Sequence, residues 1–528
     1  MDKSRLDDRM QQPDFYPEPT RRVERLETHI SWVYLLDNHV YKVKRPKNYG
    51  FLDFTTLERR RQACHEELRL NRRFAPQTYL EVVPITRDAS GFQLRGTGPV
   101  VEYAVRMKRL PAERMLCHLL QQNAPLTAAM GTLGRHLVGL HRAAPVCRGD
   151  EGRSDADHLR QNWRENLDQI APFLGETLAP SLAAALRHRV ETFLARERPA
   201  LRQREDQGWV REVHGDLHTE HICLTDPIQI FDCIEFNRRF RVSDILADLA
   251  FLRMDLQHHG RRDLADALWA AYRAALPLAD PDDGKLLRHY ELYRACVRGK
   301  VASFLSRDPD LDAAAQQQSR EMACRYFNLA GGNLLPPLLL LVSGVMGCGK
   351  SSLAQGLAAA TGWPVLRSDV VRDRLFPRAE VPDAFGTGRY TLAARDAVYR
   401  ALREEASRLL PQGQGVLVDA AFTTFAWREQ FRQLARTFHR PCLVLDLHCP
   451  EAVVRQRLAA RWQQGDDPSE GRPEWLPLQQ AAQEPVRAQE PGLGIDTTTF
   501  LLYTVNTTLG QLLEIVGDQP WASQVQSP

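Results

Sequence analysis

The sequence predicts an α+β domain followed by an α/β domain with a parallel sheet. In the first part of the chain, short strand-like segments precede long stretches of helical pattern rich in Leu, Ala, Arg and Glu. After residue 335, a buried strand, a glycine-rich loop and a helix follow one another, and strand and helix patterns then alternate. That alternation is typical of βαβ units in a parallel sheet. At 528 residues the chain is long enough for two large domains.

The composition is that of a soluble, cytoplasmic protein. Lysine and arginine number 69 against 66 aspartates and glutamates, and this near-neutral balance argues against nucleic acid or an anionic membrane as partner. The charged first residues lack the apolar segment of a secretory signal. The longest apolar stretch, 334–342, is far shorter than the roughly 20 residues of a membrane helix. The ten cysteines form no CxxC pair, which favours free thiols. Nothing in the sequence sets the oligomeric state.

The first domain is predicted to open with a hairpin around Asp37-Asn38, a turn-prone pair between two strand-like segments. Residues 56–73 follow a helical pattern, with a threonine as candidate N-cap. Two further strands, 78–85 and 101–110, flank a glycine-rich turn. Helical pattern then continues to about residue 205.

Carboxylates around residues 214–232 are spaced in a way that suits phosphoryl transfer. This reaction needs one carboxylate near the acceptor hydroxyl, and a second carboxylate with another ligand to hold Mg²⁺ on the triphosphate. Asp216 follows a strand-like run, His221 lies five residues later, and Asp232 ends an apolar segment. Asp216 fits the first role, while Asp232 and His221 fit the second.

The string His214-Gly215-Asp216, with Asp232 downstream, resembles the aminoglycoside-phosphotransferase branch of the protein-kinase-like fold over most of residues 25–330. That branch carries HGD-x4-N, so His221 stands where the resemblance implies an asparagine. Imidazole can bind a divalent metal, but Mg²⁺ prefers oxygen ligands. Tolerance of Mn²⁺, altered metal occupancy and weakened catalysis are all open, and His218 could also contribute.

The resemblance also implies a strand lysine that contacts the α- and β-phosphates. Lys42 and Lys44 are two residues apart, so both project from the same face of a strand. Lys42 is our first choice and Lys44 the second. The ion-pair partner from the next helix is Glu67, with Glu66 as the alternative.

A zinc site is a competing interpretation of the same region. Its candidate ligands are close in sequence: His214, His218, His221, Cys223 and Cys233. Zinc sites usually show compact CxxC or HxxxH pairs with a clear second pair, and this segment has none. We therefore prefer the phosphotransferase interpretation.

The limits of the domains follow from changes of pattern along the chain. Residues 331–337, with Gly331, Gly332 and two prolines, are the linker candidate. The predicted parts are a first domain at 1–330, with a small lobe at about 20–110 and a large lobe at about 111–330, a second domain at 335–517, and a loose tail at 518–528.

A phosphate-binding loop opens the second domain. The motif Gly344-x-x-x-x-Gly349-Lys350-Ser351 comes directly after a buried-strand pattern and directly before a helix, as this loop requires. Its backbone N–H groups and the helix N-terminus attract anions. Lys350 can reach the β- and γ-phosphates, and the hydroxyl of Ser351 can bind Mg²⁺. The residues predicted to bind nucleotide here are Gly344, Gly347, Cys348, Gly349, Lys350, Ser351 and Ser352.

Further chemistry is predicted at the carboxyl ends of the later strands, where open α/β sheets bind ligands. Asp369 follows a short strand, and Asp419 ends another and is suited to Mg²⁺, although a plain helix N-cap is the alternative. Arg455 and Arg461, with Arg457 between them, lie on a helix that leads into a polar segment. They are predicted to form a lid over the transferring phosphoryl group; a solvated helix face is the alternative.

Residues 335–517 resemble the small P-loop kinases of the zeta-toxin, gluconate-kinase and polynucleotide-kinase type. The resemblance implies that Asp369 is the general base on an acceptor hydroxyl, and that Arg372 and Arg389 contact acceptor or phosphate.

Together the two halves resemble bacterial fusions of an aminoglycoside-phosphotransferase-like domain with a P-loop kinase domain. The resemblance implies ATP-dependent phosphoryl transfer with Mg²⁺ to a hydroxyl of a small molecule, at two sites. One alternative is a nucleotide-responsive regulator, in which a P-loop switch controls a degenerate kinase-like module. Another is a kinase for protein or nucleic-acid 5′-hydroxyl groups, which the net charge disfavours.

Overall fold

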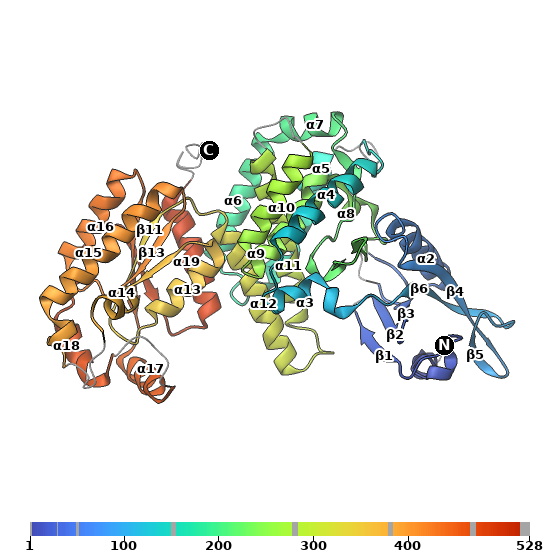
Figure 1. The fold of residues 1–528 in the computed structure, drawn as a ribbon, viewed down its shortest axis with the longest axis horizontal. Coiled ribbons are helices and arrows are strands. Elements are labelled where there is room, and N and C mark those ends of the chain that lie inside the picture. Colours follow the sequence, from blue (N-terminus) through green and yellow to red (C-terminus); the bar gives the residue numbers. More distant parts are fainter. Residues whose placement is uncertain are drawn as a thin grey trace. The chain divides into compact units, whose positions relative to one another are not determined.

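A computed structural model describes residues 3–28, 30–48, 52–148, 155–276, 283–377, 384–464 and 471–517 (Figure 1). The predicted tail, 518–528, lies outside these residues, as does 465–470 in the polar segment after the arginine-bearing helix. The chain packs as two compact units, of which one comprises Met1–Asn162 and Leu194–Arg294 and the other Trp163–Phe193 and Ala295–Pro528. Within the described ranges, no helix is both long and apolar enough to cross a membrane.

The first unit contains an antiparallel sheet in the order β1-β2-β3-β6-β4-β5. The predicted hairpin is confirmed, since β2 and β3 pair across Asp37-Asn38. The glycine-rich turn proves to hold an additional strand, β5, because Phe92 and Leu94 alternate along it and pack on the apolar cluster under the sheet. The strands are β1 Glu24–Glu27, β2 Ser31–Leu35, β3 His39–Lys44, β4 Tyr79–Asp88, β5 Gly91–Leu94 and β6 Val100–Lys108.

Helix α2, Leu57–Asn71, packs on this sheet and carries a buried acid. The hydroxyl oxygen of Thr56 accepts a hydrogen bond from the backbone N–H of Arg59, which caps the helix as predicted. The buried positions recur every three to four residues, which is the period of one helix face. Glu67 lies on that face and is fully buried, so the helix brings a carboxylate under the sheet.

The segment 213–235 contains one short antiparallel strand pair, and a second pair and an almost wholly buried helix, α9, flank it in the chain. Strand β7 (Val210–Glu212) pairs with β10 (Val242–Asp244), and β8 (Ile222–Cys223) with β9 (Gln229–Ile230). The helices that begin in this unit are α1 Lys3–Met10, α2 Leu57–Asn71, α3 Leu116–Gln121, α4 Thr127–Ala143, α5 Asp155–Ile170, α7 Arg198–Asp206, α8 Arg238–Arg241, α9 Ile245–His258, α10 Arg262–Ala275 and α11 Asp283–Leu305.

The second unit is built on a five-stranded parallel sheet in the order β12-β13-β11-β14-β15. Figure 1 shows α15 and α16 on one side of it and α13 and α19 on the other. The strands are β11 Leu339–Ser343, β12 Val365–Arg367, β13 Val416–Asp419, β14 Cys442–His448 and β15 Gly492–Asp496. The helices that begin in this unit are α6 Pro180–Arg196, α12 Ala313–Gly332, α13 Lys350–Thr361, α14 Ser368–Leu375, α15 Leu392–Leu409, α16 Phe425–Thr437, α17 Glu451–Gln464, α18 Leu476–Ala481 and α19 Leu501–Val516.

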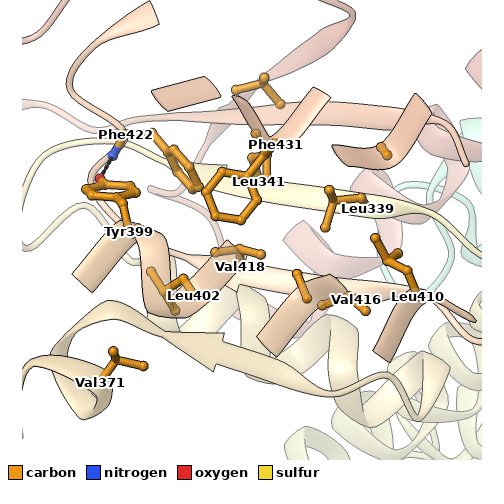
Figure 2. Close-up of a cluster of buried hydrophobic side chains, with 14 of the residues drawn as sticks. Leu339, Leu341, Val371, Tyr399, Leu402, Leu410, Val416, Val418, Phe422 and Phe431 are labelled. Atoms are coloured by element: carbon orange, nitrogen blue, oxygen red, sulfur yellow. Dashed lines mark hydrogen bonds between the residues drawn. The ribbon is translucent and has the colours of Figure 1, made fainter. Parts of the chain in front are cut away.

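One face of the parallel sheet carries the apolar cluster of Figure 2. Alternate residues of β11 and β13, including Leu341 and Val418, pack there against Leu402 of α15 and Phe431 of α16. The hydroxyl oxygen of Tyr399 accepts a hydrogen bond from the backbone N–H of Phe422, which follows the end of β13. This core fixes the carboxyl ends of the strands, where the phosphate-binding loop begins.

The predicted linker starts inside a helix. Gly331 and Gly332 form the last turn of α12, not a break after it. A Cβ on Gly332 would lie 2.4 Å from the carbonyl oxygen of Ala360, at the end of α13, and one on Gly331 would lie 2.9 Å from a methyl of Leu182. These glycines therefore serve close packing between helices, a long-range role that local sequence pattern does not reveal.

Candidate active sites

The loop between β11 and α13 has the backbone conformation that its sequence predicts. Gly347 and Gly349 both have positive φ, 74° and 95°. A Cβ on Gly347 would lie 2.9 Å from the side chain of Leu458, so this position also lacks space for one. The amino group of Lys350 donates to the carbonyl oxygen of Val345 at 2.8 Å. The side chain of Lys350 therefore lies back over the loop that precedes it.

Ser351 and Asp419 meet at the head of α13. The hydroxyl of Ser351 donates to a carboxylate oxygen of Asp419 at 2.6 Å. Asp419 ends β13 beside β11, which is why adjacent parallel strands bring the two together. Burial raises the pKa of Asp419 above its usual value. A hydroxyl and a carboxylate are the oxygen ligands that Mg²⁺ prefers, so the residues fit the metal predicted here.

A cavity of about 430 Å³ extends from this loop to Asp369, the other carboxylate predicted in this half. Asp369, in the first turn of α14, lines it and accepts a hydrogen bond from Arg372 at 2.6 Å. Ser352 also lines the cavity, whereas Gly344 and Cys348 do not. The structure therefore brings five of the seven predicted phosphate-binding residues and Asp369 to one space.

The arginines of α17 are not arranged as predicted. Arg457 and Arg461 line the cavity, but Arg455 does not; its guanidinium donates to Glu451 at 2.8 Å and is about half exposed. Residues four apart share a helix face, whereas residues six apart do not. Arg457 also donates to the carbonyl oxygen of Thr497 at 2.6 Å, which ties the helix to the loop after β15.

The far side of the cavity holds residues that the sequence did not single out. Tyr390, Arg395 and Trp475 line it, and Arg372 lies over the ring of Tyr390. Arg395 has no carboxylate partner among the described residues, and burial lowers its pKa. Arg389, by contrast, pairs with Asp373 outside the lining. Nothing local marks Arg395, because its place depends on how α15 packs against α14.

In the first unit, two lysines and Glu67 form one buried cluster. Glu67 lies 2.9 Å from the amino group of Lys42 and 2.5 Å from that of Lys44. Lys42 also pairs with Asp232, and Lys44 with Glu235. Burial would lower the pKa of Lys42, but Asp232 and Glu67 raise it well above its usual value. Both lysines are therefore held as cations beneath the sheet.

The structure places the alternatives that the sequence left open in different surroundings. Of the two lysines, Lys42 is the one that reaches Asp232. Glu66 turns away from it and pairs with Arg69 and Arg241 instead. The sequence analysis did not predict Glu235. The two lysines were the available signal, because two buried cations need more than one negative counter-charge.

The loop at His214 to Asp216 is held by Asp248 of α9. Its carboxylate accepts hydrogen bonds from the backbone N–H groups of His214, at 3.0 Å, and Gly215, at 2.8 Å. Gly215 has φ 83°, and a Cβ there would lie 2.9 Å from the carbonyl oxygen of Phe240. Asp244 caps α9 by accepting from the N–H of Leu246. Both aspartates therefore hold backbone N–H groups in place around this loop and at the start of α9.

Asp216, His221 and Asp232 converge in front of the lysines. The Nδ1 atom of His221 lies 3.6 Å from a carboxylate oxygen of Asp216, and its Nε2 atom lies 3.7 Å from one of Asp232. The ligand atoms of Asp216, His218 and His221 all lie within 4.8 Å of one another. Asp232 suits Mg²⁺, but the imidazole of His221 does not, so this pair does not fit the magnesium site that the resemblance implies.

The five-residue zinc set does not assemble. The thiols of Cys223 and Cys233 are directed at the backbone carbonyl oxygens of Pro111 and Val213. His214 uses Nε2 to donate to the carbonyl oxygen of Phe231. The rings of His218 and His221 lie near each other, with centroids 3.9 Å apart.

Comparison with known proteins assigns both halves. Residues 36–287 match the family model described as Phosphotransferase enzyme family, and residues 339–486 match the one described as AAA domain. These matches confirm the predicted fold class, a kinase-like α+β domain followed by a P-loop domain with a parallel sheet.

Relatives extend over most of the chain. Uncharacterized proteins of Mycobacterium tuberculosis and Mycobacterium bovis are each 30% identical over 441 residues, which is 82% of this chain and 85% of theirs. Among solved structures, a gluconokinase from Sinorhizobium meliloti is 22% identical over 34% of this chain and 95% of its own (TM-score 0.27). A choline/ethanolamine kinase family protein from Mesorhizobium loti is 14% identical over 68% and 99% (TM-score 0.39).

Proposed function

We propose that this chain, which belongs to the same family as the two mycobacterial proteins, is an ATP-dependent phosphotransferase with a separate phosphoryl-transfer site in each half. Both halves belong to kinase families. We keep residues 1–330 and 335–517 as the proposed limits of the two catalytic domains.

The observation that carries the proposal is an arrangement of a lysine and two carboxylates that recurs in both halves. In the C-terminal half, Lys350, Ser351 and Asp419 gather at the phosphate-binding loop, and Asp369 lines the same cavity apart from them. In the N-terminal half, Lys42 and Asp232 pair, and Asp216 lies across His221 from them. Each site thus has one carboxylate for the triphosphate side and one for the acceptor side.

The chemistry of the C-terminal half follows from these positions. Lys350 and the loop N–H groups hold the β- and γ-phosphates of ATP. Ser351 and Asp419 would hold Mg²⁺, which would supply neutralisation of the charge on those phosphates. Asp369 takes the proton of the acceptor hydroxyl as its oxygen bonds to the γ-phosphorus, the bond to the β–γ bridging oxygen breaks, and ADP leaves. Arg457 and Arg461 stabilise the charge on the transferring group.

The lining of the cavity also indicates what the acceptor of this half carries. Arg395 has no carboxylate partner among the residues that the structure describes, and its guanidinium lies over the ring of Phe385, which also lines the cavity. A guanidinium in that position favours an anionic group on the acceptor. We therefore expect a small hydroxyl compound that is also an anion.

A metabolite extract with γ-labelled ATP tests the proposal. Asp216→Asn should remove one labelled product, and Asp369→Asn another, each by at least about a hundredfold, because a general base contributes at least that much. Lys350→Ala should behave like Asp369→Asn. The product lost with Asp369→Asn should form from the anionic fraction of the extract. Full labelling of every product in both aspartate variants would contradict the proposal.

His221 favours a second candidate, the nucleotide-responsive regulator. An imidazole in a kinase metal site is compatible with a module that binds nucleotide without turnover. The same assay separates the two: in a regulator, Asp216→Asn removes no product, while Asp369→Asn and Lys350→Ala still abolish labelling or ATP consumption.

A further inference from the structure

The tautomer of His221 is set by its backbone contact. Its Nδ1 atom lies 2.9 Å from the carbonyl oxygen of Asp216, and a carbonyl only accepts, so Nδ1 carries the proton of this hydrogen bond. In a neutral imidazole only one of the two ring nitrogens carries a proton. The Nε2 atom therefore presents a bare lone pair.

That lone pair faces a carboxylate. The Nε2 atom of His221 lies 3.7 Å from one oxygen of Asp232, while the other oxygen of Asp232 is taken by Lys42. Two acceptors at this distance have no proton to share. Two ligands that each lie about 2.1 Å from a tetrahedral ion are roughly 3.4 Å apart, close to the observed separation. The pair is thus spaced like two ligands of one cation.

The ligand types decide which cation fits. One imidazole nitrogen and one carboxylate oxygen suit first-row transition metals, whereas Mg²⁺ demands oxygen and keeps its waters. The ring of His218, 3.9 Å from that of His221, adds a second imidazole to the surroundings. The phosphate-binding loop of the other half offers only oxygens, from Ser351 and Asp419.

We propose that His221 and Asp232 bind a divalent transition-metal ion of the Mn²⁺, Co²⁺ or Zn²⁺ class, so that the N-terminal half works with such an ion where its resemblance implies magnesium. The inference relies on the proposed function for the task of the site, but not for its ligands. Asp216 does not bind the metal in this proposal and keeps its role as the carboxylate near the acceptor hydroxyl.

Pulsed electron paramagnetic resonance with Mn²⁺ as the probe tests this in the full-length protein without nucleotide. We expect coupling of the manganese to an imidazole nitrogen, with the change of coupling expected for ¹⁵N when the protein is labelled with ¹⁵N-histidine. The coupling should disappear in His221→Asn. His448→Asn is the matched control, because His448 is an exposed histidine that also lies near an aspartate, Asp446, at 3.4 Å, and it should leave the coupling unchanged.

Competition between metals gives a second measurement. The preference for Mn²⁺ over Mg²⁺, taken as a ratio of dissociation constants, should fall by about tenfold or more in His221→Asn, since an amide oxygen replaces the imidazole. Absence of nitrogen coupling in the wild type overturns the inference, and so does coupling that survives in His221→Asn or that only His218→Gln removes.

These outcomes are independent of those for the proposed function. Nitrogen coupling without any labelled product leaves the metal site standing and removes the phosphotransferase. A product that depends on Asp216, without nitrogen coupling, does the reverse. Unchanged thermal unfolding of His221→Asn shows that loss of coupling reflects loss of a ligand and not of the fold.

Discussion

At the residue scale, the position of an arginine along α17 determines whether its side chain lines the cavity. Arg461 lines the cavity of the P-loop half, whereas Arg455 pairs with Glu451 in solvent. We expect Arg461→Ala to lower the turnover of the product assigned to that half by about 10² to 10³, the usual cost of one donor to a developing charge. Arg455→Ala, the matched control on the same helix, should stay within about twofold. Equal losses in both variants would place the helix in the wrong rotation.

A second prediction at this scale concerns His289 of α11. Burial lowers its pKa to about 3, against about 6.5 in an unfolded chain. Between these values the unfolded chain binds a proton that the folded chain does not, so stability falls as the pH drops from about 6.5 towards 3, by up to about 1.4 kcal/mol per pH unit. Urea unfolding of the N-terminal unit at pH 7 and pH 5 should show a smaller pH dependence in His289→Gln. An identical dependence in the two proteins would refute this assignment.

At the scale of elements, α19 closes the second unit against α6. A Cβ on Gly510 would lie 2.3 Å from the backbone nitrogen of Leu182, and the side chain of Asn506 accepts from the N–H of Ala179 at 2.7 Å. Gly510→Ala should therefore destabilise this unit by roughly 1–3 kcal/mol, the usual cost of overpacking. Thermal unfolding measures it.

Gly139 of α4 provides the control for that substitution. It is also inside a helix, but a Cβ there would meet nothing within 4 Å. Gly139→Ala should stabilise its unit by up to about 1 kcal/mol, the propensity difference between the two residues. If Gly510→Ala stabilised the protein as well, the close approach of α19 and α6 would be wrong.

These elements also mark the limit of what the sequence can predict. Ser351 and Asp419 were found because a local motif and the edge of a parallel sheet suffice to bring them together. Glu67 was chosen because the family resemblance implies an ion-pair partner for the strand lysine in the next helix. Gly332 was mistaken for a linker residue, since only the position of Ala360 reveals its role. Arg395 gave no signal, because its environment arises from the packing of separate helices.

At the scale of the whole molecule, two kinase families share one chain, and each half holds its own lysine and carboxylates. Every role assigned to these residues assumes that each half binds a nucleotide by itself. Lys42 belongs to the cluster around Glu67, and Lys350 closes the phosphate-binding loop. The two lysines can therefore be changed separately.

Isothermal titration calorimetry with a non-hydrolysable ATP analogue tests this assumption most directly, with Mg²⁺ and Mn²⁺ both present. The wild type should bind two molecules of analogue per chain, and Lys42→Ala and Lys350→Ala should each retain one. Binding of a single molecule by the wild type, or loss of all binding in Lys350→Ala alone, would contradict the account.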